Sequence, residues 1–104
     1  MENSVPAEGA DTVIIRRHTR DAVVITIAGE VDTLDADGLV ECVRECAAES
    51  DDDLVLDFRD VSFVSVSVLG RLVAVRERLA AQGRTVRMCV PTGGVGRYFK
   101  LVGL

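Results

Sequence analysis

The chain has 104 residues with a formal net charge of -5, and aromatic residues make up only 4% of it. This length predicts a single domain with one modest hydrophobic core. The negative charge disfavours nucleic acid or an anionic membrane as the main partner, because both require clustered cations. The scarcity of aromatic residues argues against a surface that stacks bases, so we expect an aliphatic core and no nucleic-acid partner.

The charge is unevenly distributed along the chain. Residues 1–60 contain 16 acidic and 5 basic residues, a net charge of -11, whereas residues 61–104 contain 1 acidic and 7 basic residues, a net charge of +6. Such segregation permits a basic patch on the second half that would meet an acidic protein partner. Interleaving of the two halves into a mixed surface is the more common outcome, and we favour it from the sequence.

The cysteines indicate a reducing environment rather than a metal site. There are three, Cys42, Cys46 and Cys89, with no signal peptide ahead of them, so a cytoplasmic location is expected. Cys42 and Cys46 share a helix face and could start a metal site. The only histidine is His18 and there is no second Cys pair, so we expect packed thiols, with no metal or other cofactor. No apolar run approaches the roughly 20 residues of a membrane span, which predicts no membrane insertion.

The first residues predict a tail followed by a β-hairpin. Residues 1–11 contain few apolar side chains and are expected to form a flexible N-terminal tail, outside a domain that spans residues 12–104. Thr12–His18 and Ala22–Ala28 are rich in β-branched residues, which favours two neighbouring strands. His18 ends the first strand and is interpreted as a surface residue rather than a catalytic base.

A helix and a parallel strand are predicted next. Gly29-Glu30-Val31-Asp32 is expected to break the second strand, and Thr33 or Asp35 to cap a helix that ends at Glu49. Apolar residues recur there at helical spacing and predict a face that packs on the sheet: Leu39, Val40, Val43 and Ala47. Leu54–Phe58 is typical of a strand buried on both faces. The length of the connection fits a β-α-β crossover, so this strand should run parallel to the one before the helix.

A serine-rich joint after Phe58 leads into a second helix. This helix is predicted to stop at Gly83 and is indicated by apolar residues at a spacing of 3.6: Leu69, Leu72, Val73 and Leu79. Arg84–Val90 is predicted to be a fourth strand, and Gly94–Leu101 a short last helix. The alternation of strands and helices predicts the α/β class, with a mixed sheet of four to five strands and the first strand antiparallel at an edge.

The joint contains three hydroxyl side chains, Ser62, Ser65 and Ser67. Ser65 or Ser67 is the natural N-cap of the second helix, which is the ordinary use of such a hydroxyl. A serine at a helix start also tolerates a phosphate, because the positive end of the helix dipole lies beside it. A phosphoserine carries about -1.5 to -2 charges, enough to eject a partner whose docking surface is apolar or acidic. Such a serine would switch binding without unfolding its own domain.

Enzymatic interpretations are weaker. A Ser-His-Asp hydrolase requires a base within reach of the nucleophile, and this chain has one histidine and no G-x-S-x-G motif. Gly93-Gly94-Val95-Gly96 follows a predicted strand and precedes a predicted helix, as phosphate-binding loops do, but it lacks the Lys-Ser/Thr of a P-loop. We therefore interpret these glycines as a flexible turn and the protein as a non-enzyme.

Four features together resemble the STAS family, and within it the small bacterial anti-sigma factor antagonists. They are Gly29-Glu30-Val31-Asp32, the segment Leu56 to Val61, Leu69-Gly70 with the following amphipathic helix, and the segment from Pro91 to Leu104. In order and spacing they cover nearly all of the predicted domain. The resemblance implies a single STAS-like domain whose C-terminal part is shorter than in many relatives.

The resemblance implies a cytoplasmic bacterial phosphoprotein that regulates transcription by partner switching. The unphosphorylated protein would bind an anti-sigma factor of the ATP-binding serine-kinase type and so release a sigma factor, and serine phosphorylation would end that binding. A PP2C-type phosphatase is a further partner, and a homodimer would cover apolar surface that the short C-terminal part exposes. The alternative is a STAS accessory subunit of a lipid-transport ABC system.

By the same resemblance the phosphorylated residue is Ser67, with Ser65 as the alternative. The partner-binding residues are expected around it: Asp32, Thr33, Ser65, Ser67, Val68, Leu69 and Gly70. Where the family usually has Asp-Ser-Ser/Thr-Gly-Leu-Gly, this chain has Ser65 in place of the Asp, Val66 in place of the first Ser and Val68 in place of the Gly. We expect the branched side chain of Val68 to narrow access to Ser67.

Overall fold

A computed structural model describes the backbone of residues 2–6 and 12–104 and the side chains of residues 12–104. The strands form one sheet in the order β1-β2-β3-β4-β5. They are β1 (Glu2–Pro6), β2 (Thr12–His18), β3 (Ala22–Val31), β4 (Asp53–Val64) and β5 (Val86–Cys89). The helices are α1 (Ala36–Glu49), α2 (Val66–Ala81) and α3 (Gly93–Leu101), and a short 3₁₀ helix, η1 (Thr33–Asp35), precedes α1. The predicted α/β class with a mixed sheet is confirmed.

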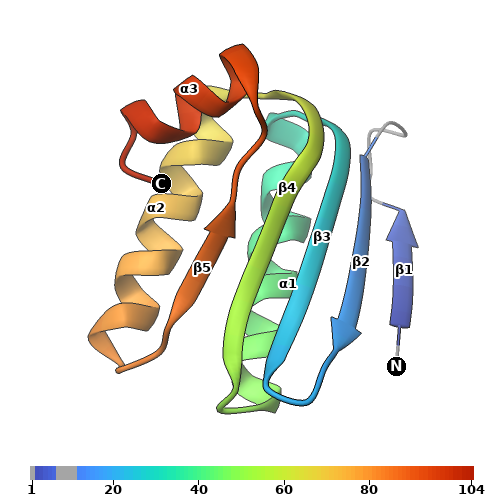
Figure 1. Ribbon diagram of the computed structural model, residues 1–104, viewed down its shortest axis with the longest axis vertical. Helices are drawn as coiled ribbons and strands as arrows, with labels where there is room; N and C mark the ends of the chain where they lie inside the picture. Colours follow the sequence, from blue (N-terminus) through green and yellow to red (C-terminus); the bar gives the residue numbers. More distant parts are fainter. Residues whose placement is uncertain (1, 7–11) are drawn as a thin grey trace.

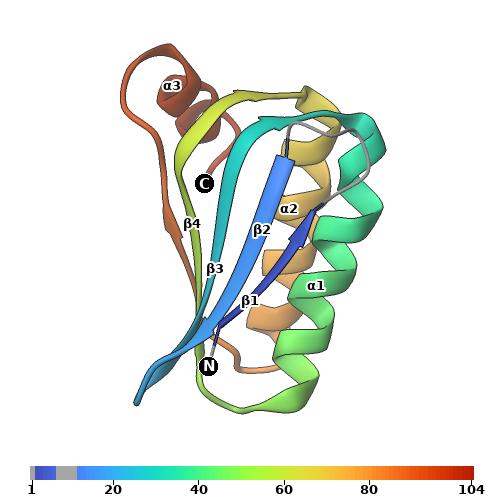
Figure 2. The same ribbon diagram turned by 90° about the vertical axis from the view of Figure 1, so that its right-hand side faces the viewer.

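The sheet topology confirms the predicted connections. β2 and β3 form an antiparallel hairpin, whereas β4 runs parallel to both β3 and β5. α1 connects β3 to β4, α2 connects β4 to β5, and both helices lie on the same face of the sheet (Figures 1 and 2). This arrangement results when parallel strands are added in one direction through crossovers of the same hand. The carboxyl ends of β3 and β4 therefore meet at one end of the sheet.

The hydrophobic core lies between the sheet and these two helices. Every second residue on β3 is fully buried, at Val23, Ile25 and Ile27, as the period of a strand requires. Most of the predicted faces of both helices are buried against the sheet, at Leu39, Val40, Val43, Ala47, Leu69, Leu72 and Leu79. Val73 is only half-buried, and Val75 is buried although it was not predicted. The aliphatic composition of this layer agrees with the sequence prediction.

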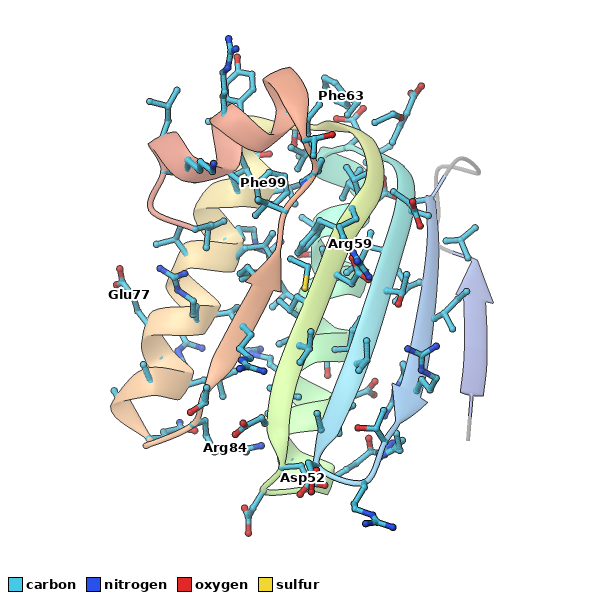
Figure 3. The ribbon with its side chains drawn as sticks, in the orientation of Figure 1. Asp52, Arg59, Phe63, Glu77, Arg84 and Phe99 are labelled. Atoms are coloured by element: carbon cyan, nitrogen blue, oxygen red, sulfur yellow. The ribbon has the colours of Figure 1, made fainter. Side chains whose placement is uncertain are left out.

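β4 is covered on one face only, which corrects the prediction of a strand buried on both faces. Its residues Val55 and Asp57, which alternate with the buried ones, are partly exposed. Arg59 lies on the face turned away from α1 and α2 (Figure 3) and donates to the Asp57 carboxylate at 2.8 Å. This hydrogen bond lowers the pKa of Asp57 below its ordinary value. A short apolar run does not reveal which faces of a strand are covered, because that depends on where the crossovers lie.

β3 and β4 are both longer than predicted. The sequence predicts a break at Gly29, but β3 continues to Val31 and pairs with β4 as far as Val64. The ladder shifts register between Gly29 and Glu30, and Gly29 has a φ of 96°. A glycine in this left-handed region accommodates an irregularity in the ladder, so it bends the strand without ending it.

The N-terminal residues also differ from the prediction of a flexible tail over residues 1–11. Glu2–Pro6 pair antiparallel with β2 and form the edge strand β1, while residues 7–11 lie outside the described residues. An edge strand is held by backbone hydrogen bonds to its neighbour, which do not require apolar side chains. Composition alone therefore does not distinguish such a strand from a tail. Pro6 stands at the end of this strand, a position that tolerates proline.

Cys42 and Cys46 lie on α1 as predicted, with Cys46 fully buried and Cys42 half-buried. A hydrogen bond from Cys42 lowers the pKa of the Cys46 thiol to about 7, and burial opposes this effect. The same hydrogen bond and burial raise the pKa of Cys42. Among the described residues, no group of three or more His, Cys, Asp or Glu side chains is placed to hold a metal ion.

The two ends of the sheet are stabilised differently. At the lower end in Figure 3, Arg84 lies near Asp52 and donates to the backbone carbonyls of Ala47 and Ser50, each at 2.6 Å, and of Asp52 at 3.1 Å. The predicted fourth strand starts later than expected, at Val86, while Arg84 joins the end of α1 to the start of β4. At the upper end, Phe99 of α3 packs on Phe58 of β4 with ring centroids 5.1 Å apart.

Candidate functional site

The serine joint lies where the ends of β3 and β4 meet. The backbone N–H of Ser65 donates to the carbonyl of Val31 at 3.0 Å, which ties the start of α2 to the end of β3. Asp32 and Thr33, which follow Val31, are therefore brought beside Ser65 and Ser67, although more than thirty residues separate the two pairs in sequence. We call this group of Asp32, Thr33, Ser65 and Ser67 the serine corner.

Ser65 and Ser67 take different positions on α2. Ser65 is the N-cap, and its hydroxyl accepts the backbone N–H of Val68 at 3.4 Å. Ser67 is the second residue of the helix and is exposed. The sequence left both as candidates for the cap, and the structure assigns it to Ser65. Ser62 is not in the joint, because it lies within β4, where its hydroxyl donates to the Gly29 carbonyl at 3.4 Å.

Three hydroxyls of the serine corner form a closed set of hydrogen bonds. The Thr33 Oγ1 lies 2.9 Å from the Ser67 Oγ and 3.4 Å from the Ser65 Oγ. The Ser65 and Ser67 Oγ atoms are 3.1 Å apart. Each hydroxyl has one proton to donate and lone pairs to accept. The Ser67 oxygen is thus held between two partners while remaining open to solvent.

Asp32 caps η1, which precedes α1. Of the two predicted caps, Asp35 holds the N-cap position of α1 without a side-chain cap hydrogen bond, and Thr33 lies within η1. The Asp32 Oδ1 accepts the backbone N–H of Thr33 at 2.7 Å, and the Asp35 Oδ2 accepts the backbone N–H of Asp32 at 2.8 Å. The Asp32 side chain also accepts the Asp35 N–H, so Asp32 and Asp35 form a reciprocal capping box. Asp35 is buried, and its Oδ2 also accepts the Thr12 hydroxyl at 3.1 Å. The capping box therefore fixes the backbone of the serine corner to the sheet.

Not all of the predicted partner-binding residues present their side chains to a partner. Val68 and Leu69 are 1% and 0% exposed and belong to the core, where they fix α2 to the sheet. Val68 therefore does not narrow access to Ser67 as predicted. Helical geometry explains this, since residues at the second and third positions of a helix point in directions about 100° apart. Gly70 is exposed, with open space around its Cα.

Sequence reasoning missed an exposed apolar rim around the serine corner. Leu34 is 79% exposed, Val66 is 64% exposed, and Phe63 at the end of β4 is 49% exposed. Phe63 also lines a pocket of about 300 Å³ with Val64, and α3 supplies the rest of the lining: Gly94, Val95 and Tyr98. The period of a strand predicts that Phe63 and Val64 face opposite sides of the sheet. How exposed each side chain is depends on the position of α3, which the sequence does not predict.

The comparisons place these features in a known family. A model of the STAS domain matches residues 13–104, which is nearly the whole chain. The chain belongs to the STAS-domain family. A search of curated protein sequences found no match.

Solved structures share the STAS-domain fold with this chain. An anti-sigma factor antagonist from Mycobacterium paratuberculosis superposes with a TM-score of 0.77 at 22% identity, covering 93% of this chain and 82% of that one. An anti-sigma factor antagonist STAS domain from Rhodobacter sphaeroides gives 0.52 at 15% identity, covering 79% and 89%. Mglu matches with 0.62 at 16% identity over 70% of this chain, but only 18% of its own chain. These similarities establish the fold.

No helix among the described residues of this STAS-domain chain is both long and apolar enough to cross a membrane.

Proposed function

We propose that this STAS-domain protein is an anti-sigma factor antagonist that phosphorylation of Ser67 switches off. The observation that carries the proposal is the exposed Ser67 hydroxyl at the start of α2, held beside the Asp32 loop at the ends of two parallel strands. The match in fold to an anti-sigma factor antagonist over 93% of the chain supports this class of function. The partner is an anti-sigma factor of the ATP-binding serine-kinase type, and its capture releases a sigma factor in the bacterial cytoplasm.

The surroundings of Ser67 favour a protein partner. The exposed side chains of Leu34, Phe63 and Val66 flank the hydroxyls and offer apolar surface for a docked protein. Asp32 adds an acidic group at the same corner, where it completes the capping box and leaves its second carboxylate oxygen for a partner's donor. The protein is the ligand and the phosphate acceptor in this scheme, and it needs no catalytic group of its own.

The chemical step belongs to the kinase and can be written completely. The Ser67 Oγ forms a bond to the γ-phosphorus of ATP, the bond from that phosphorus to the ADP oxygen breaks, and the hydroxyl proton passes to a base of the kinase. The product carries about -1.5 to -2 charges next to apolar side chains that the partner would cover. A PP2C-type phosphatase reverses the change by hydrolysis. Burying such a charge in an apolar interface is costly, so the partner leaves.

Two variants at position 67 test the proposal. We expect Ser67→Asp to weaken binding to the ATP-binding anti-sigma factor of the same organism by about tenfold or more, which corresponds to about 1.4 kcal/mol. Ser67→Ala should bind as wild type does and should take up no phosphate. Isothermal titration calorimetry measures the affinities, and phosphopeptide mass spectrometry after incubation with ATP locates the phosphate.

Ser62→Asp is the matched control, because it adds the same charge to an exposed serine on β4 outside the hydroxyl set. It should bind the anti-sigma factor nearly as tightly as wild type. Equal affinities for wild type and Ser67→Asp would refute the switch. Co-purification with a transporter ATPase in place of an anti-sigma factor would refute the function itself.

A further inference from the structure

Thr33 is placed to share a hydrogen bond with Ser67. The Thr33 Oγ1 lies 2.9 Å from the Ser67 Oγ, and either hydroxyl can be the donor. The Ser65 Oγ lies 3.1 Å from the Ser67 Oγ, where again either hydroxyl can donate, and 3.4 Å from the Thr33 Oγ1. Each hydroxyl has one proton to donate and two lone pairs, so the three groups can satisfy one another around Ser67.

Phosphorylation of Ser67 removes one proton from this set of hydroxyls. The Ser67 oxygen becomes an ester oxygen that only accepts, and the new phosphoryl oxygens are strong acceptors. The Thr33 hydroxyl, whose oxygen lies 2.9 Å from the Ser67 Oγ, keeps its own proton. Rotation about one side-chain bond turns this proton toward the phosphoryl group. Ser65 still accepts the Val68 N–H, so the helix cap is preserved.

We propose that Thr33 is a positioning residue for Ser67: its hydroxyl orients Ser67 before transfer and donates to the phosphate afterwards. The inference rests on the proposed phosphorylation of Ser67 and adds a second residue, on a different element, to that switch. Thr33 is the first residue of η1, just after the end of β3, whereas Ser67 lies on α2. A hydrogen bond from Thr33 would therefore hold the phosphate of Ser67 between these two elements, beside Asp32. The phosphate then blocks the surface between β3 and α2 and does not swing into solvent.

The test uses phosphoserine inserted at position 67 during translation, so that no kinase is needed. Phosphorus NMR measures the second pKa of the phosphate, which is about 6 for phosphoserine. A donor to the dianion favours the charged form, so removing the donor in Thr33→Val should raise this pKa by roughly 0.5 or more. Thr33→Ser keeps the hydroxyl and should restore the wild-type value. The charged groups on the elements that meet here, Asp32 and the Asp37–Arg71 ion pair, are the same in all three proteins.

A purely structural role of Thr33 predicts a different outcome. In that case Thr33→Val would leave the pKa at position 67 unchanged, or would change it equally for phosphoserine inserted at position 62 on β4, and either result overturns the proposal. The proposed function fails separately, because it is judged by anti-sigma factor binding. Thr33 is exposed, so the valine variant is expected to fold, and a far-ultraviolet circular dichroism spectrum checks this.

Discussion

Ser65 and Ser67 are two residues apart, but their hydroxyls contact different groups. Ser65 satisfies the Val68 N–H, one of the backbone donors that the first turn of a helix leaves without a partner. Among the described residues, the Ser67 hydroxyl forms side-chain hydrogen bonds with the hydroxyls of Thr33 and Ser65. One serine therefore stabilises the helix start, while the other is available for modification without loss of the cap.

This division of roles predicts different stabilities for two alanine variants. Ser65→Ala removes the N-cap of α2 and should lower the free energy of unfolding by about 1 kcal/mol. Ser67→Ala removes an exposed hydroxyl and should change it by less than about 0.5 kcal/mol. Urea denaturation followed by circular dichroism measures both values. An equal loss for the two variants would show that the cap is not at Ser65.

At the scale of the element, α3 depends on one close backbone approach. A Cβ at Gly96 would lie 1.9 Å from the carbonyl oxygen of Pro91, whereas a Cβ at Gly94 meets nothing within 4 Å. The two glycines are on the same helix, so they form a matched pair. The approach at Gly96 lets α3 fold back over the end of the sheet, where Phe99 reaches Phe58. The predicted short helix over Gly94–Leu101 is confirmed, and the interpretation of its glycines as a flexible turn is wrong.

Gly96→Ala should consequently destabilise the protein far more than Gly94→Ala. Overpacking against a fixed backbone atom costs about 1–3 kcal/mol, while alanine at an open helical position is neutral or stabilises by up to about 1 kcal/mol. The midpoints of urea unfolding compare the two variants directly. If both unfold at the same urea concentration, α3 does not pack as described.

At the scale of the whole molecule, the basic residues of the second half and the acidic residues of α1 belong to different elements. The basic residues are carried by α2, β5 and α3, which lie beside one another in Figure 1, and include Arg71, Arg76, Arg78, Arg87, Arg97 and Lys100. The exposed acids Asp37, Glu41, Glu45 and Glu49 lie on α1. The two halves also meet, as in the Arg71–Asp37 ion pair, and the mixed surface stays a prediction.

Arg84 links distant parts of this molecule and should be sensitive to substitution. Its guanidinium donates to the carbonyls of Ala47, Ser50 and Asp52, three acceptors that a single ammonium cannot match in geometry. Arg84→Lys should cost about 1–2 kcal/mol of unfolding free energy. Arg87→Lys, at an exposed position on β5, is the matched control, because it makes the same substitution and also preserves the positive charge. It should lower the free energy of unfolding by less than about 0.5 kcal/mol. Equal stability of the two variants in thermal unfolding would contradict the link.

The sequence by itself determined the class, the order of the strands and α-helices from β2 to α3, and the position of the joint. Those features depend on local periodicity, which is clear in the spacing of the hydrophobic residues of α1, α2 and β3. It also indicated Ser65, Ser67 and Asp32 as a set through resemblance to a family.

Only the tertiary structure decided which hydroxyl caps α2, that Thr33 contacts Ser67, and that Val68 is buried. These facts depend on the register between β3 and β4, which brings residues more than thirty positions apart into contact. The irregularities in the ladder near Gly29 help to set this register. Such irregularities exist only in the paired strands, so the local sequence pattern of one strand does not predict them.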